Sequence, residues 1–426
     1  MNDGARGVQR TYLTLTLLTT LAASFIWGIN TLFLLDAGLN NTEAFAANAF
    51  FTLGMLVFEV PTGVVADTRG RRLSFMLGTA TLVVSTLLYM FMWQIQAPFW
   101  AWALASVLLG LGFTFFSGAT EAWLVDALKH TGYEGGLESV FGRGQVVSGA
   151  AMLTGSVLGG VVAQFTDLGV PYLLRAALLA VTLVVAWRFM RDLGFTPQRG
   201  LSPVAAVRNV VSGAVDGGLR NRPVRWLMLA APFAGGVGIY AFYAAQPYLL
   251  ELYGDPQAYT IAGLAAALVA GAQIVGGLLV SRFRRLFRRR TTVLLIGAAL
   301  TSALLVVVGL TSSFVIALVL LAVWCLVRAF AWPMRQAYIN GLIPSGQRAT
   351  VLSFDALMGS AGGVVAQPAL GRVADVWGYG QSYVVGGIVS AFVLPFIWLA
   401  RREKAASDPI VAEPAAPAPE PAPAAR

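Results

Sequence analysis

The chain of 426 residues has little charge and few of the side chains on which enzymes rely. Charged residues make up 12% of the sequence, about half the usual share, whereas hydrophobic residues make up 57%. There is one histidine, His130, and one cysteine, Cys325. These shortages exclude a soluble globular protein, a disulfide framework and a cysteine-based metal cluster. They also leave no cluster of nucleophile, base or metal ligands, so we expect no enzyme, no catalytic residue, no metal and no cofactor.

Lysine is scarce as well, and its positions exclude one source of energy. Lys129 and Lys404 follow a leucine and a glutamate, so the chain lacks the Gly-Lys-Ser/Thr core of a phosphate-binding loop. ATP-driven pumping by this chain alone is therefore excluded. Any uphill movement of a solute would have to draw on a proton gradient or another ion gradient.

Long apolar runs are what the chain has instead. A run of about 20 apolar residues can cross a bilayer, and the first run is too long for the core of a cleaved signal peptide. The sequence predicts an all-α membrane protein with twelve transmembrane helices. They cover about residues 12–35, 44–66, 73–94, 99–125, 143–165, 171–193, 225–250, 259–281, 291–309, 314–340, 350–370 and 380–400.

The basic residues predict how these spans are oriented. An even number of spans places both termini on one side, and nearly all loop arginines and lysines lie on that side, whereas Arg372 stands on the other. The positive-inside bias predicts cytoplasmic termini in a plasma membrane, or in the inner membrane of a bacterium that has two. The net charge of +9 is thus explained by topology. The expected partner is the lipid bilayer, and no nucleic acid is expected.

The longest loop between spans divides the chain into halves. It covers 194–224 and predicts one six-helix bundle over 1–193 and a second over 225–404, with a short helix at 202–217 on the anionic inner leaflet. The Ala/Pro/Glu-rich stretch 405–426 is predicted to be a disordered tail. Similar Gly-rich segments near 158 and 370 suggest that the halves are duplicates.

The most specific motif lies between the second and third spans. Residues 63–72 read Gly-Val-Val-Ala-Asp-Thr-Arg-Gly-Arg-Arg, in which Gly63 and Gly70 permit close packing and Asp67 can accept hydrogen bonds from arginines. This turn resembles the signature loop of major facilitator superfamily transporters. In the second half Ser281 replaces the aspartate, so the second copy of the turn is degenerate.

The resemblance implies a secondary transporter with its substrate site between two six-helix bundles. It also implies that Asp67, Arg71 and Asp126 form a latch that closes the cytoplasmic side in the outward-facing state. The alternative is an ion pair that only fixes topology. With Arg143 and Asp355 added because they lie at the same mouth, the predicted cytoplasmic gate comprises Gly63, Asp67, Gly70, Arg71, Asp126, Arg143 and Asp355.

Two carboxylates inside the spans are candidates for proton coupling. Glu59 and Glu121 lie in the cytoplasmic halves of spans 2 and 4, where burial would favour titration. Static pairing with Arg143 is the alternative. The proton is the expected coupling ion.

The substrate is predicted to bind near Arg328, which lies in the middle of span 10, too deep to reach either interface. It could anchor an anionic or polar substrate or pair with a carboxylate, and Arg335 could share its face. The full set of substrate-binding candidates is Trp27, Asn30, Tyr240, Tyr243, Gln246, Gln273, Arg328 and Trp332.

A small-residue motif in span 5 bears on the cargo. Residues 151–160 are similar to the Gly-x-x-x-Gly-Pro-x-x-Gly-Gly motif of drug/proton antiporters, but Ala151 and Ser156 replace a glycine and the proline. Such residues can also simply pack helices. The leading prediction is proton-coupled efflux of drugs or hydrophobic compounds by a monomer. The alternatives are transport of a sugar or organic anion and, third, a non-transporting membrane receptor.

Overall fold

The computed structural model describes residues 3–197, 203–283, 286–343 and 348–410, and its elements are helices. The first bundle contains α1 (Asp3–Trp27), α2 (Asn30–Asp36), α3 (Asn41–Arg69), α4 (Arg71–Gln94), α5 (Phe99–Thr114), α6 (Ala119–His130), α7 (Leu137–Phe165) and α8 (Val170–Phe189). A connecting segment contains α9 (Pro203–Ala214) and the π-helical turn η1 (Val215–Leu219). The second bundle contains α10 (Arg222–Tyr253), α11 (Tyr259–Phe283), α12 (Arg290–Leu310), α13 (Phe314–Asn340), α14 (Arg348–Trp377), α15 (Tyr379–Ala391) and α16 (Val393–Arg402).

The predicted all-α membrane fold is confirmed, and each predicted span corresponds to one long helix or to two consecutive helices. By length and composition, ten described segments could cross a membrane, and the α1–α2 pair, bent by 49°, would be the eleventh. The remaining predicted span, at 350–370, corresponds to α14, which is 30 residues long. Its polar side chains, among them Asp355 and Gln367, lower its hydropathy, yet it packs between α3 and α10 inside the molecule.

Three of the predicted continuous spans, at 12–35, 99–125 and 380–400, are each divided into two helices, and the structure shows what accommodates the first two breaks. Between α5 and α6, Gly118 adopts a left-handed backbone with φ of +66°, which glycine tolerates without a steric penalty. Between α1 and α2, the backbone groups that the break frees are satisfied by a side chain from α10, described below. Neither break interrupts the apolar run, and for this reason the hydropathy pattern did not reveal it.

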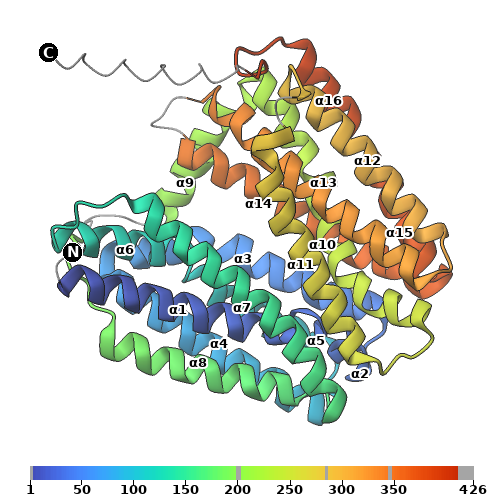
Figure 1. Cartoon of the computed structure of the whole chain (residues 1–426), viewed down its shortest axis with the longest axis horizontal. Coiled ribbons are helices and arrows are strands. Elements are labelled where there is room, and N and C mark those ends of the chain that lie inside the picture. The colour runs from blue at the N-terminus through green and yellow to red at the C-terminus, as the bar shows by residue number, and fades with distance from the viewer. Residues whose placement is uncertain (1–2, 198–202, 284–285, 344–347, 411–426) are drawn as a thin grey trace, which may run out of the picture.

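The two bundles meet at one end of the molecule and diverge toward the other (Figure 1). We call the end at which α1 begins and α16 finishes the basic end, because it carries Arg71, Arg72 and Arg191. The other is the opposite end. In Figure 1 the bundles are closest near α2, α5, α10 and α11, at the opposite end. Buried apolar clusters hold the helices together, such as the stack of Phe33 on Tyr172 with ring centroids 4.0 Å apart. Two clusters also join the bundles, since Leu250 belongs to the first-bundle cluster and Phe45 to a second-bundle one.

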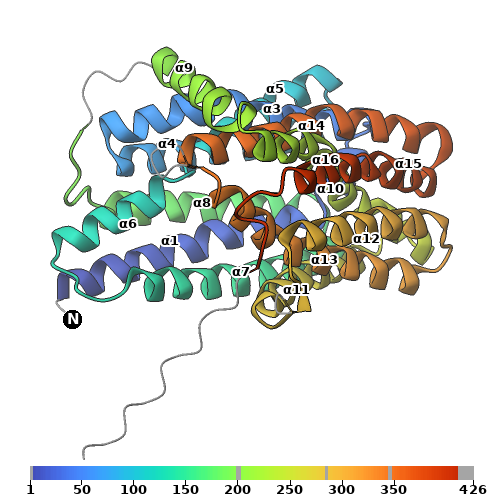
Figure 2. The same ribbon diagram turned by 90° about the horizontal axis from the view of Figure 1, so that it is seen from above.

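The connecting helix α9 lies on the side where the bundles diverge. The expected helix at 202–217 is present over Pro203–Ala214, and it contacts both α3 of the first bundle and α14 of the second. Figure 2 shows it along the edge of the molecule beside these two helices. It therefore contacts both bundles as well as offering exposed Val204 and Val207 to its surroundings.

The first six residues of the predicted disordered tail, 405–410, are folded. Residues 405–410 fold back against the basic end of the second bundle, where Asp408 is buried and accepts hydrogen bonds from the N–H and hydroxyl groups of Thr291, at 2.9 and 3.0 Å. Asp408 thus satisfies a free N–H group at the start of α12, and this local bonding outweighs the disorder-prone composition. Residues 411–426 of the predicted tail lie outside the described residues.

Candidate functional site

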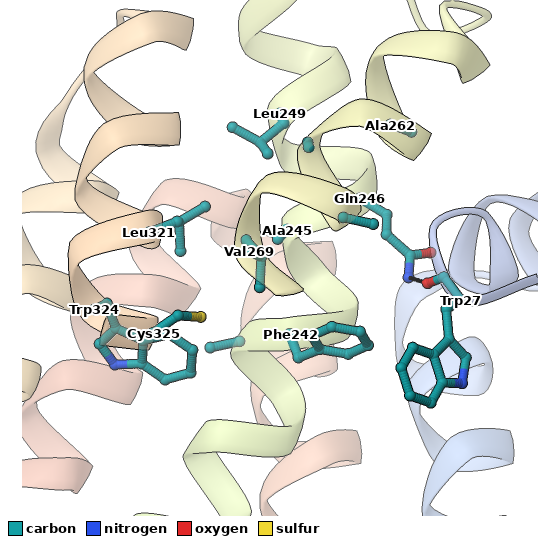
Figure 3. Close-up of a pocket in the computed structure, with 13 residues that line it drawn as sticks. Trp27, Phe242, Ala245, Gln246, Leu249, Ala262, Val269, Leu321, Trp324 and Cys325 are labelled. Carbon is teal, nitrogen blue, oxygen red and sulfur yellow. Dashed lines mark hydrogen bonds between the residues drawn. The ribbon is translucent and has the colours of Figure 1, made fainter. Parts of the chain in front are cut away.

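A glutamine from the second bundle closes the opposite end by binding the break between α1 and α2. The Gln246 side chain accepts a hydrogen bond from the Thr31 N–H at 2.8 Å and donates one to the Trp27 carbonyl at 2.7 Å (Figure 3). The Thr31 hydroxyl also donates to the Tyr243 carbonyl at 3.0 Å. A broken helix with its free backbone groups satisfied by another bundle is a joint that can open only if those bonds are replaced.

A second joint lies at the outermost turn of α3. The carboxylate of Asp375, on α14, accepts hydrogen bonds from the backbone N–H groups of Asn41 and Thr42 at 2.9 and 2.8 Å. These groups are free donors at the start of a helix, where a negative charge is favourable. The Tyr379 hydroxyl donates to the Asn41 side chain. Both helices of this joint are thereby held together at the opposite end.

Glycines allow α7 and α11 to touch between these joints. A Cβ added to Gly160 would lie 2.5 Å from the Tyr259 carbonyl oxygen and 2.9 Å from the Gly263 Cα, so any larger residue would push the helices apart. Gly155, from the same small-residue motif, faces Ser24 of α1. The motif in span 5 therefore serves helix packing here, both within the first bundle and between the bundles.

Below the joints, toward the basic end, an arginine is buried without a carboxylate. Arg175 of α8 is 2% exposed, and its Nε donates to the Thr86 hydroxyl at 3.2 Å. The hydroxyl groups of three tyrosines lie within electrostatic range of its guanidinium, two from the first bundle and Tyr243 from the second. In the part of the chain that the structure describes, no ion pair to Arg175 is formed within 4.0 Å. A charge at this depth costs free energy unless a countercharge, a polar partner or water stabilises it.

Amide side chains with unused bonding groups lie close to this arginine's helix. Asn30 donates to the Asn48 side chain at 3.0 Å and accepts from the Tyr172 hydroxyl at 3.0 Å. The Asn48 side-chain nitrogen is buried without a partner among the described residues, and so is the Gln367 side-chain oxygen. Gln367 bonds to Thr52, one helical turn from Asn48 on α3. A polar ligand or water molecules would form hydrogen bonds with these free buried donors and acceptors between the bundles.

An apolar pocket adjoins the joint formed by Gln246. Trp27 of the first bundle faces Phe242 edge-on at 6.5 Å between ring centroids, and Trp324 and Cys325 close the other side (Figure 3). The free volume inside is about 20 Å³, enough for a water molecule and far too small for a drug-sized ligand. Access for a ligand therefore requires these side chains or the bundles to move.

Arg328, the central predicted substrate residue, lies beside this pocket. Its Nη1 donates to the Ala234 carbonyl at 3.2 Å, and its guanidinium carbon is 4.8 Å from the centroid of the Trp324 ring. Gly238 leaves room for it, since a Cβ there would lie 2.5 Å from Nη2. Like Arg175, it forms no ion pair within the described ranges. Among the described residues, each bundle thus contains an arginine within a span that has no carboxylate partner.

The other predicted substrate residues divide into two groups. Trp27, Asn30, Tyr243 and Gln246 lie at the bundle interface, as described above. Tyr240 also contacts the other bundle, since it packs on Phe45 of α3, but it is 1% exposed and donates its hydroxyl to Ser382, so its role as a free cavity residue is not seen. Trp332 is 55% exposed and lies outside the lining of the pocket. Gln273 is exposed, and its side chain lies beside the Cys325 thiol.

The predicted latch is only partly assembled in this conformation. Asp67 and Arg71 form an ion pair at 2.6 Å, but among the described residues Asp126 makes no ion pair with Arg71. The Nε of Arg71 is buried and has no partner there. A Cβ at Gly63 would meet no atom within 4 Å, so the close packing expected at this glycine is absent.

A residue that the sequence did not suggest completes the turn after α3. The Asp192 carboxylate accepts a hydrogen bond from the Arg72 N–H at 2.9 Å and so caps α4. Gly70 has a φ of +113°, and a side chain there would collide with Asp192. Both the positive φ and the lack of space therefore require glycine at position 70. The partner lies 120 residues away in the sequence, which explains why the motif alone did not identify it.

The four ionisable groups expected to converge at the basic mouth do not form one network. Asp355 is 3% exposed and pairs with Arg335 within the second bundle, with its Oδ1 2.6 Å from Nη2. Glu59 accepts a hydrogen bond from the Ser117 hydroxyl at 2.5 Å. Glu121 and Arg143 are exposed. Because Glu121 is in the first turn of α6, where a negative charge is favourable, its exposed position has a local cause.

Several residues of the interface were missed by the sequence analysis. Arg175 was assigned to the outer edge of span 6 and counted only for topology, although an arginine within a span is itself a signal. Asn48 and Gln367 carried a weaker signal, an amide inside an apolar run. Trp324, whose Nε1 is buried without a partner among the described residues, had none that distinguishes it from a packing residue.

Comparison with known proteins places this architecture in a family. A family model of the Major Facilitator Superfamily matches residues 12–326 and 287–424. An uncharacterized MFS-type transporter, MJ1560, of Methanocaldococcus jannaschii is 20% identical over 384 residues, which cover 89% of this chain and 94% of that protein.

Solved structures resemble the whole fold. The nucleoside transporter NupG has a TM-score of 0.74 at 11% identity, with 94% of this chain and 100% of that chain covered. A bacterial homolog of the human lysosomal transporter Spinster, in an inward-facing and unoccupied conformation, has a TM-score of 0.70 at 15% identity, with 94% and 98% covered. At these identities the likeness concerns the fold alone.

Proposed function

The chain belongs to the Major Facilitator Superfamily and is a secondary transporter of small molecules, and from this premise we propose that its substrates carry a negative charge. The observation that carries the proposal is Arg175, a buried arginine of the first bundle within electrostatic range of Tyr243 of the second, with no carboxylate within ion-pair distance among the described residues. Arg328 of the second bundle is half-buried and likewise has no carboxylate within ion-pair distance among the described residues. An anionic substrate would supply the countercharge that both residues lack.

We further propose that the structure represents the inward-open state. The loop arginines place the basic end in the cytoplasm by the positive-inside rule. The bundles are joined at the opposite end by Gln246, Asp375 and Gly160, and they diverge toward the basic end (Figure 1). In this state the latch of Asp67, Arg71 and Asp126 is expected to be open, which agrees with the absence of an Asp126–Arg71 pair. The transporter is proposed to work as a monomer.

Efflux of hydrophobic compounds is the second candidate, and the aromatic pocket favours it. Trp27, Phe242 and Trp324 offer the apolar faces on which uncharged or cationic compounds bind. The antiporter-like motif in span 5 gives less support than expected, because its glycines have packing roles that explain them. We therefore rank an organic anion above a drug as the substrate.

A matched set of ligands separates the two candidates. Purified protein is screened by thermal shift against aromatic and aliphatic carboxylates, and each is compared with the neutral amide and the cationic amine of the same carbon skeleton. Carboxylates are expected to stabilise the protein, and the selected compound should then exchange across proteoliposome membranes in a counterflow assay. Stabilisation and flux confined to amines or neutral compounds would instead establish drug-like cargo.

Proton coupling is proposed to involve Glu59 and Glu121, which lie on the divergent side of the first bundle. A coupling carboxylate is needed for accumulation against a gradient but not for exchange of substrate on both sides. Glu121→Gln should therefore abolish proton-driven accumulation and leave counterflow within about twofold of the unmodified protein. If accumulation persists in Glu121→Gln and in Glu59→Gln alike, neither residue carries the proton.

A further inference from the structure

A groove between α1 and α8 at the basic end is lined by three arginines that have no part in the function proposed above. Arg10 comes from α1, Arg188 from the last turn of α8, and Arg191 follows that helix. All three are exposed. Within the described residues none of them pairs with a carboxylate within 4.0 Å, in contrast to Arg6 nearby, which pairs with Asp3. The volume of the groove is about 530 Å³.

The groove is a built feature with fixed walls. Trp123 is 2% exposed, and its Nε1 donates to the Arg191 carbonyl at 2.7 Å, which holds the backbone beneath that arginine. The Arg188 guanidinium carbon lies 5.2 Å from the centroid of the Phe189 ring, which limits its orientation. On α1 the lining residues are small, including Gly7 and Thr14, and so they leave room between the helices.

The apolar surface beside the groove continues along α8. Val181 and Val184 are 50% and 62% exposed, and they lie seven and four residues before Arg188 on the same side of the helix. At about 1.5 Å per residue, this apolar strip extends roughly 10 Å from the arginine toward the membrane centre. The charged groove is thus at headgroup level, and the strip is at the level of acyl chains.

We propose that this groove binds an anionic phospholipid of the leaflet at the basic end, with the phosphate between the three arginines and the acyl chains along α8. The arginines supply donors in the forked geometry that matches phosphate oxygens. Basic pockets between helices at a membrane surface recognise anionic headgroups in this way. The exposed apolar strip favours a lipid over a soluble phosphate, because a soluble ligand would leave it uncovered.

The test compares lipids that differ only in headgroup charge. Binding of phosphatidylglycerol and of phosphatidylcholine with the same acyl chains is measured by native mass spectrometry on the whole purified chain in detergent, with glycerophosphate as the chain-free probe. Each basic residue is worth about fivefold at an anionic surface, so the double variant Arg188→Gln/Arg191→Gln should weaken phosphatidylglycerol binding by about 25-fold. Arg402→Gln, an exposed arginine at the basic end of the second bundle, is the matched control and should change nothing.

A second variant protects the test against loss of folding. Thr14→Trp keeps all three arginines and fills the groove, and it should also weaken phosphatidylglycerol binding while thermal unfolding remains as in the unmodified protein. Equal binding of the two lipids, or unchanged phosphatidylglycerol binding in both variants, would overturn the proposal. Glycerophosphate binding as tight as that of the lipid would do the same, since the occupant would then be a soluble phosphate. None of these outcomes depends on the charge of the transported substrate.

Discussion

Replacement of Arg175 should separate a substrate-binding arginine from a structural one. In Arg175→Met the charge is lost while an unbranched side chain continues to fill the space. The Thr86 hydroxyl, which accepts from Arg175, also donates to the Leu82 carbonyl at 2.6 Å, so it keeps a partner. No carboxylate within the described residues is left unpaired. The free energy of unfolding should therefore change by less than about 1 kcal/mol or rise, because a desolvated charge is removed.

Substrate affinity should respond much more strongly than stability. A hydrogen bond to a charged group contributes about 1.5–3 kcal/mol, which corresponds to a loss of about 10- to 150-fold in affinity for an anionic substrate. The neutral amide of the same substrate makes no ion pair and should lose little. The affinity of Arg175→Lys for the anionic substrate should lie between those of the unmodified protein and Arg175→Met, since lysine keeps the charge and loses the planar fork of donors.

Calorimetric titration and thermal unfolding on the same preparations check both expectations. Arg372→Met is the matched control, because Arg372 is exposed and lies on α14 toward the opposite end. If Arg175 instead belonged to a structural ion pair, Arg175→Met would lower the free energy of unfolding by about 3–5 kcal/mol. The reasoning is refuted if Arg175→Met unfolds that readily, or if carboxylate and amide lose affinity equally.

Three other substitutions test individual contacts of the fold. Gly160→Val places side-chain atoms against the Tyr259 carbonyl, so spin-label distances across the opposite end should lengthen; unchanged distances would show that this contact does not hold the end closed. Asp355→Ala leaves Arg335 without its partner and should lower the free energy of unfolding by about 3–5 kcal/mol, whereas the double variant with Arg335→Met should recover most of it; equal loss in both would contradict the pairing. Asp408→Ala removes two hydrogen bonds at the start of α12 and should lower the free energy of unfolding by about 1–3 kcal/mol. Truncation after residue 410 keeps these bonds and should leave the free energy of unfolding unchanged.

The spans were predictable because each depends on a local property. An apolar run and its flanking charges are read from neighbouring residues, and the helix bounds at 99, 259 and 314 coincide with the predicted starts. The breaks in the helices were not predictable in the same way. The break after Trp27 is stabilised by Gln246, 219 residues away, and nothing within the apolar run indicates that partner.

The site was harder to predict than the fold because its residues are defined by what they lack. Arg328 was recognised from its depth, but Arg175 was discounted because it stands near the end of its span. Only the structure shows that no carboxylate in the described residues lies within ion-pair distance of either. Conversely, Tyr240 looked like a cavity residue, and its hydroxyl is taken by Ser382. Sequence position gives the depth of a side chain in the membrane but not its partner.

A carrier alternates between states that differ in free energy by only a few kcal/mol. The contacts that close one end must therefore be about as stabilising as the contacts that close the other end, so that both states are populated. At the opposite end the contribution comes from bonds to Gln246 and Asp375. At the basic end the Asp67–Arg71 pair is already formed although the bundles diverge, so that pair alone cannot be what closes the end.

Closure must come from contacts made only when the second bundle approaches. Among the described residues, the Nε of Arg71 has no hydrogen-bond partner and Asp126 forms no ion pair within 4.0 Å, so both could take part on the first bundle. On the second bundle, α14 is the helix that already contacts α3, and α9 contacts both. Because α9 lies on the side where the bundles diverge, it cannot keep both contacts unchanged when they close. We therefore expect its position to shift relative to α3 or α14 in every transport cycle, so that the connecting segment takes part in gating.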